Sequence, residues 1–161
     1  MKNNEYPTWL VPLEIAKELK AIGFNEPCLV TYHEVFDEEM IFISFEGDDY
    51  CYYYAELSEC SQRTNSEMGK DILETGKHYS YACSIPTWTD VLAWFRKKNL
   101  VGLVSYRYRD KNNKGFSFEI LDEDADVFLY KTYEQAQEAL VYKLIEIYKS
   151  EQNENLHIRK D

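Results

Sequence analysis

Residues 28–57 constrain the fold most strongly, because they contain three successive segments with the composition of β-strands. Branched and aromatic residues dominate "PCLVTYHEVF" and "MIFISFEGDDYCYYYAEL", and an acidic turn separates the two stretches. Such residues favour extended backbone, and short connections between strands favour antiparallel pairing. We predict antiparallel strands at about residues 28–36, 40–46 and 50–57.

Three amphipathic stretches predict helices. Apolar residues recur at steps of three and four in residues 12–22, which end before Gly23. The same spacing follows Pro86, and it returns in the stretch that ends at about residue 149. Between the helices, "YSYACS" predicts a fourth strand at about residues 79–84.

Polar residues at the predicted helix starts have the types that cap helices. Thr87 is the expected N-cap of the second helix, with Asp90 three residues later in a position that favours the helix dipole. Thr132 and Gln135 have the spacing of a capping box for the last helix. The helix boundaries are therefore predicted independently of the apolar pattern.

The segment "LVGLVSYRYRDKNNKGFSFEIL" predicts a β-hairpin with two different faces. The expected aromatic face holds Tyr106, Tyr108, Phe118 and Ile120. The expected charged face holds Arg107, Arg109, Ser117 and Glu119. This register requires an odd number of residues in the loop, and Gly115 is the expected bulge residue.

These elements predict an α+β fold in one domain over residues 1–149. We expect an antiparallel or mixed sheet of about six strands, with three helices packed mainly on one of its faces. Residues 58–78 lack a clear period and are expected to form a long loop. Residues 150–161 are expected to be a flexible polar tail.

The net charge of −11 disfavours binding to bulk nucleic acid, because a polyanion would be repelled. The acidic runs at 37–39, 46–49 and 122–126 are most simply solvated loops, with DNA mimicry or cation binding as alternatives. No apolar stretch is long enough to span a membrane, so a cytoplasmic location is expected. The four cysteines lack zinc-site spacing and are expected to be reduced core thiols.

The sequence offers little that predicts catalysis. It has no HExxH, Walker or GxGxxG motif, so we expect no metal and no cofactor. Of its three histidines, His78 alone has candidate acid/base partners, in Asp71 and Glu74. This favours a binding protein over an enzyme.

Two groups of residues are candidates for a binding site. In an extended strand Tyr52 and Tyr54 share one face, which could pack in the core, form an interface or stack on a planar ligand. Arg107 and Arg109, with Lys111 and Lys114 in the hairpin turn, form the clearest basic patch. Pairing of the arginines with Glu119 and nearby acids is the simpler interpretation, and a phosphate clamp beside aromatic rings is the alternative.

Three segments, "LEIAKELKAIGFNEPC", "IPTWTDVLAWFRKKNL" and "YKTYEQAQEALVYKLIEIYK", resemble small uncharacterised proteins of phages and prophages of gut Bacteroidetes. They cover about a third of the chain and contain no catalytic residues that the resemblance transfers. The resemblance implies an accessory phage protein, and such proteins often disarm bacterial immunity. A sponge for a nucleotide signal and an acidic decoy are two strategies that need no catalysis.

The leading functional prediction is a non-enzymatic protein that sequesters a small nucleotide signalling molecule. The alternative is an acidic protein-interaction module, either a DNA mimic or an inhibitor of a host immune protein. The chain has 14 tyrosines in 161 residues, an ample supply of rings that suit an interface. We therefore also predict a homo-oligomer, most simply a two-fold dimer.

Overall fold

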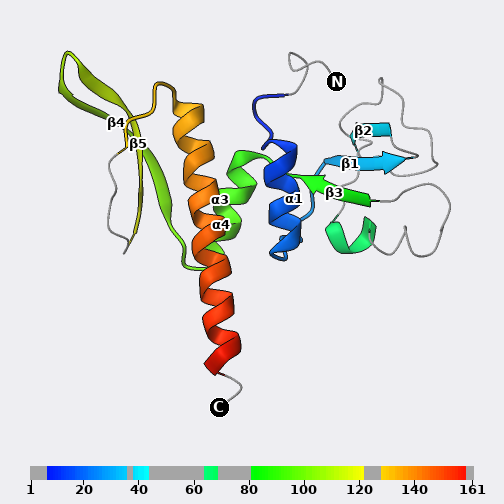
Figure 1. Cartoon of the computed structure of the whole chain (residues 1–161). Helices are drawn as coiled ribbons and strands as arrows, with labels where there is room; N and C mark the ends of the chain where they lie inside the picture. Colours follow the sequence, from blue (N-terminus) through cyan, green and yellow to red (C-terminus); the bar gives the residue numbers. More distant parts are fainter. Residues whose placement is uncertain (1–6, 36–37, 44–63, 69–80, 122–127, 159–161) are drawn as a thin grey trace. The chain divides into compact units, whose positions relative to one another are not determined.

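The computed structural model describes residues 7–35, 38–43, 64–68, 81–121 and 128–158 (Figure 1). The chain divides into two compact units, an N-terminal unit, Met1–Asp90, and a C-terminal unit, Val91–Asp161. Helices and strands occur in both, which confirms the α+β class. The single domain over residues 1–149 stays a prediction.

The N-terminal unit contains a three-stranded antiparallel sheet. Its strands are β1 (Val30–Val35), β2 (Glu38–Ile43) and β3 (Tyr81–Ile85), in the order β2-β1-β3, so that β1 is central (Figure 1). Val30 pairs with both Ile43 and Ile85, which fixes the register on each side of β1. The predicted antiparallel pair near 28–36 and 40–46 and the strand near 79–84 are confirmed.

Helix α1 (Leu13–Ala21) packs against β3. It buries Ile15, Ala16 and Leu19, which are the apolar positions that predicted it. The helix ends before Gly23, whose φ of 90° lies in the left-handed region where a side chain is disfavoured. The chain then reverses, and the N–H of Phe24 donates to the carbonyl of Leu19 at 2.9 Å.

A helical turn at residues 65–68 lies within the predicted loop of residues 58–78. Thr64 and Glu67 form a reciprocal capping box: the N–H of Thr64 donates to the Glu67 carboxylate at 2.7 Å, and the N–H of Glu67 donates to the Thr64 hydroxyl at 3.2 Å. The rest of that loop, the predicted strand at 50–57 and His78 lie outside the described residues.

Asn65 fastens this turn to the rest of the N-terminal unit. Its buried side-chain amide donates to the carbonyl of Phe24 at 2.7 Å and accepts from the N–H of Ser84 at 3.0 Å. Met68 on the same turn is fully buried. One asparagine therefore joins the segment that follows α1 to β3.

Helix α3 (Trp88–Lys97) begins as predicted. The side chain of Asp90 accepts hydrogen bonds from the N–H and the hydroxyl of Thr87, at 3.1 and 2.7 Å, and the Thr87 hydroxyl accepts from the N–H of Asp90 at 3.2 Å. In the C-terminal unit, Trp94 and Phe95 pack edge-on against Tyr148, with ring centroids 5.1 and 6.4 Å away. These rings join α3 to the last helix.

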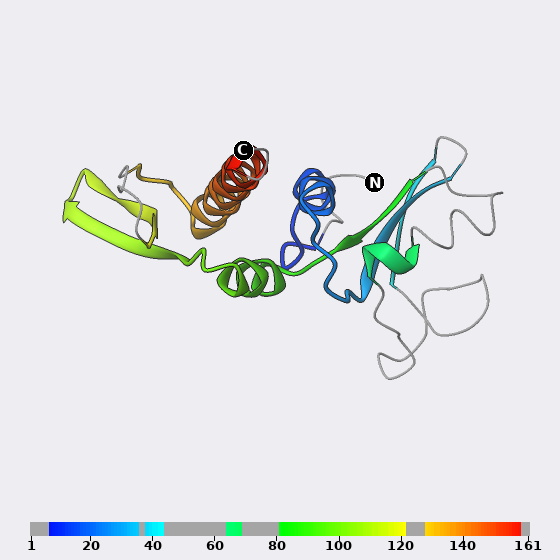
Figure 2. The same cartoon turned by 90° about the horizontal axis from the view of Figure 1, so that it is seen from below.

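The C-terminal unit also contains a hairpin of β4 (Gly102–Asp110) and β5 (Asn113–Ile120), followed by α4 (Tyr133–Ile158). Helix α4 packs along both strands. In both views the first residues of β4 lie beside α4, whereas the turn of the hairpin lies away from it (Figure 1 and Figure 2). Only one end of the hairpin is therefore covered by the helix.

Three sequence predictions need correction. The described strands form two separate sheets, β2-β1-β3 and β4-β5, so the single sheet of about six strands is not found among the described residues. The register shift lies between Tyr108 and Asp110 on β4, not at Gly115. Helix α4 continues to Ile158, past the end of the apolar stripe, because residues 150–158 contain no proline or glycine to end it.

Candidate functional site

The β4-β5 hairpin has the two faces that the sequence predicted. Tyr106 lies opposite Phe116, and Val104 opposite Phe118, so these side chains share one face, called here the aromatic face. The ring of Phe116 packs edge-on against Tyr106, with centroids 5.3 Å apart, and also against Tyr133 of α4 at 6.0 Å. Phe116 thus joins the middle of the aromatic face to the first residue of α4.

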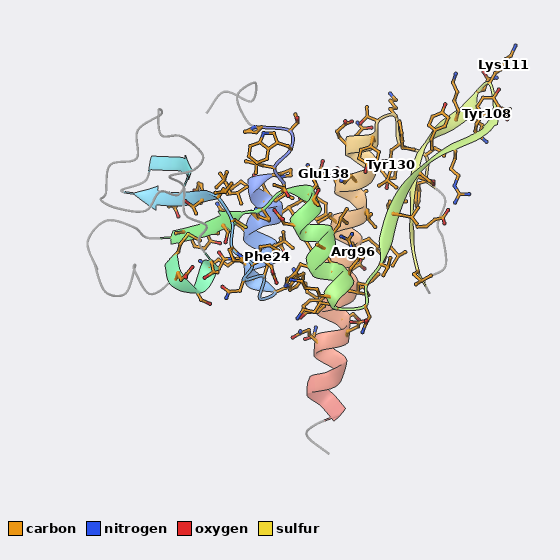
Figure 3. All side chains as sticks on the ribbon, turned by 180° about the vertical axis from the view of Figure 1, so that it is seen from behind. Phe24, Arg96, Tyr108, Lys111, Tyr130 and Glu138 are labelled. Carbon is orange, nitrogen blue, oxygen red and sulfur yellow. The ribbon has the colours of Figure 1, made fainter. Side chains whose placement is uncertain are left out.

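The aromatic face becomes more exposed toward the turn. Ile120, near α4, is buried, whereas Tyr106 is 56% exposed and Tyr108 is 62% exposed. Figure 3 shows Tyr108 and Lys111 together at the far end of the hairpin. Lys114 lies directly opposite Tyr108 in the register and is exposed. Two tyrosine rings and two lysines are therefore presented to solvent on the uncovered end.

On the opposite face, Arg107 is held by residues of the hairpin itself. Its guanidinium forms an ion pair with Glu119, and its Nε–H donates to the hydroxyl of Ser117 at 3.2 Å. Both charged side chains are 40% exposed. The predicted pairing with Glu119 is confirmed, and a phosphate at Arg107 would have to displace this carboxylate.

The other predicted site residues fall in different places. Lys111 is exposed in the two-residue turn, where the Asp110 carboxylate accepts from the N–H of Asn112 at 2.8 Å. Arg109 stands at the register shift of β4. Tyr52 and Tyr54 lie outside the described residues, so their proximity to the basic patch stays a prediction.

A second cluster of basic and aromatic residues lies in the N-terminal unit. It consists of Lys17, Lys20, Tyr32 and Tyr81 and is called here the lysine–tyrosine cluster. The lysines are three residues apart on α1 and so share a helix face. The tyrosines share a sheet face, because Tyr32 pairs with Cys83 and Tyr81 is two residues before it.

The lysine ammonium groups lie over the tyrosine rings. Lys17 Nζ is 4.8 Å from the ring centroid of Tyr32 and 5.8 Å from that of Tyr81. Lys20 Nζ is 4.3 Å from the centroid of Tyr81, and it also donates to the carbonyl of Ala82. The two rings are 6.3 Å apart and tilted by 58°. Lys17 therefore makes cation–π contacts with both rings, and Lys20 makes one with Tyr81.

Burial changes the acid–base properties of this cluster. Desolvation lowers the pKa of Lys20, and the nearby Cys83 opposes that change. Desolvation raises the pKa of Cys83 to about 11, although Lys20, Tyr81 and Lys17 all act to lower it. Burial likewise raises the pKa of Cys28 to about 12. Both thiols are protonated near neutral pH, which makes them poor nucleophiles.

Sequence reasoning did not identify the lysine–tyrosine cluster. The spacing of Lys17 and Lys20 on a predicted helix was visible in "IAKELK". The missing information was the pairing of β1 with β3, since these strands are distant in sequence and their adjacency brings Tyr32 beside Tyr81. No local sequence pattern indicates that β1 and β3 pair.

Comparison with protein-family models, curated proteins and solved structures finds no significant match. In the parts of the chain that the structure describes, no group of three or more histidine, cysteine or acidic side chains is arranged to hold a metal ion. None of the described helices is long and apolar enough to cross a bilayer. The function is therefore inferred from the side chains of the hairpin and of the lysine–tyrosine cluster.

Proposed function

We propose that this is a non-enzymatic binding protein whose β4-β5 hairpin docks on a partner protein. The observation that carries the proposal is the exposure of Tyr106 and Tyr108 at the end of the hairpin that α4 does not cover. Tyrosine is enriched at protein interfaces, where its ring is buried while its hydroxyl keeps a hydrogen bond. Such rings commonly contribute most of the binding energy.

The charge of the hairpin defines the partner surface. Residues 106–116 include four basic residues and one acidic residue. Their formal net charge is therefore +3, whereas that of the whole chain is −11. The partner surface that fits is acidic around an apolar recess for the two rings. An immune protein of a bacterial host is the partner that the phage resemblance suggests.

Affinity capture with matched variants tests the proposal. We expect the wild-type chain to retain a specific host protein, and the Tyr106→Ala/Tyr108→Ala variant to lose it. Tyr142→Ala is the control, because Tyr142 is 43% exposed on α4 and lies outside the hairpin. Equal recovery by all three proteins, or recovery by none, would contradict docking through the hairpin.

Salt dependence and light scattering identify the type of partner. A tyrosine-centred contact with a basic rim should weaken only partly between about 0.1 and about 0.5 M NaCl, since salt screens only the rim. If wild-type protein is instead a dimer that the double tyrosine variant dissociates, the partner is a second copy of this chain. Loss of all binding at the higher salt would contradict an apolar centre.

Sequestration of a small nucleotide is the second candidate function. It is favoured by the cross-strand pairing of Lys114 with Tyr108, which puts a basic residue directly opposite an exposed aromatic residue. It is weakened by the ion pair of Arg107 with Glu119. Calorimetry with cyclic dinucleotides is the test, and the absence of both heat and thermal stabilisation would remove this candidate.

A further inference from the structure

Within the part of the chain that the structure describes, the lysine–tyrosine cluster holds two positive charges that no carboxylate neutralises by an ion pair. Lys17 and Lys20 both reach the ring of Tyr81, and in the described part of the chain neither forms an ion pair with a carboxylate. Both lysines are half-buried, so their mutual repulsion is less screened than it would be in water. An anion bound between them would relieve this repulsion.

The two ammonium groups also have hydrogen-bond capacity to spare. An ammonium has three N–H donors, and Lys20 directs one of them to the carbonyl of Ala82. The Lys17 ammonium contacts the two rings and acts electrostatically on Cys83, and it makes no hydrogen bond to another described residue. The rings attract the positive charge but do not replace an oxygen acceptor.

Glu34 is the acidic group that would compete with a bound anion. It lies opposite Tyr81 in the register and two residues after Tyr32, so it belongs to the same sheet face. Burial is the main cause of the raised pKa of Tyr81, and the charge of Glu34 adds to it. The carboxylate therefore acts on the same ring that both ammonium groups contact, and its charge would oppose a bound anion there.

We infer that Lys17 and Lys20 bind the phosphate group of a small ligand, either inorganic phosphate or a phosphomonoester. Phosphate offers several oxygens to two separate ammonium groups, and its charge of about −1.5 to −2 near neutral pH complements theirs. Lysine is a common phosphate ligand that acts as a point charge. This site is independent of the hairpin, since its residues all lie in the N-terminal unit.

Calorimetry and phosphorus NMR on the full chain test this inference, with inorganic phosphate, adenosine monophosphate and adenosine as probes. We expect the first two to bind, and Lys17→Gln to weaken binding about tenfold, the equivalent of about 1.4 kcal/mol. Lys17→Arg keeps the charge and should keep most of the affinity. Glu34→Gln should strengthen binding several-fold, because it removes the competing carboxylate.

Lys98→Gln is the matched control, since Lys98 also lies over a ring, at 5.4 Å from the centroid of Trp94, but in the C-terminal unit. It should leave binding unchanged. Tighter binding of the nucleotide than of phosphate would identify a phosphomonoester ligand, and equal binding would indicate the phosphate group alone. The inference is overturned if neither phosphate compound binds, if adenosine binds equally well, or if Lys17→Gln and Lys98→Gln have the same effect.

Discussion

The carbonyl oxygen of Tyr130 lies 2.6 Å from the point that a Cβ atom on Gly115 would occupy. The chain before α4 is fixed there by two hydrogen bonds between Tyr130 and Phe116, of 2.7 and 2.9 Å. Gly115 is itself buried. The glycine therefore allows a third backbone segment to pair with β5, which explains its presence better than the bulge predicted from sequence.

Gly115→Ala should consequently destabilise the protein by about 1–3 kcal/mol, because backbone must move to admit the methyl group. Gly102→Ala is the comparison, since its new Cβ would meet the side-chain end of Leu140, which can move more easily than backbone. Chemical denaturation of both variants measures the difference. A Gly115→Ala variant as stable as the wild type would show that residues 128–130 do not hold this position in solution.

The ion pair between Arg107 and Glu119 should contribute little to stability. Both side chains are 40% exposed, and exposed pairs typically contribute about 0.2–1 kcal/mol. A double-mutant cycle with Arg107→Ala and Glu119→Ala should give a coupling energy in this range, falling as salt is added. A coupling above about 2 kcal/mol would mean that the hairpin is less solvated than the structure shows.

Local signals in the sequence predicted most of the described elements. The predicted capping residues begin both helices: Thr87 with Asp90 at α3, and Thr132 at α4. At α4 the N–H of Gln135 donates to the Thr132 hydroxyl at 3.2 Å. The same signal, a threonine followed three residues later by Glu67, was present at Thr64. The helical turn there is too short to show an apolar period, so the capping signal stands without a second one to support it.

The arrangement of the strands could not be predicted in the same way. The alternation along β4 and β5 predicted which side chains share a face, because a shift of one residue would move every ring to the other face. Nothing local indicates that β3 pairs with β1, or that the hairpin forms a sheet of its own. Sites built within one hairpin, such as Arg107 with Glu119, were therefore predictable, and the lysine–tyrosine cluster was not.

Asn65 should matter more for stability than its place in an unpatterned segment suggests. Its side chain donates a hydrogen bond to the carbonyl of Phe24 and accepts one from the N–H of Ser84. Asn65→Ala would remove both hydrogen bonds from these buried backbone groups. Each such group costs about 1–3 kcal/mol when unsatisfied. Denaturation should show a loss of at least about 2 kcal/mol, while Ser66→Ala on the exposed side of the turn should change little. Equal effects of the two substitutions would contradict the bridging role of Asn65.

The buried thiols of Cys28 and Cys83 predict how stability depends on alkaline pH. Burial raises the pKa values of these thiols in the folded chain to about 12 and about 11, above the value of 9.0 expected on unfolding. Between pH 9.0 and the raised pKa of each thiol, the folded state holds a proton that the unfolded state has lost. The free energy of unfolding therefore falls as pH rises through this range. Each thiol should contribute a slope of up to about 1.4 kcal/mol per pH unit above about pH 9, and almost none below it.

Denaturation of the wild type and of a Cys28→Ala/Cys83→Ala variant between pH 7 and pH 11 measures this contribution. The variant should be less stable than the wild type at neutral pH, because two buried side chains are shortened. Its stability should nevertheless fall less steeply above about pH 9, so the two curves should converge as pH rises. Parallel curves across the whole range would mean that the thiols ionise as easily in the folded chain as in the unfolded one, and that β3 is more open to water than its burial indicates.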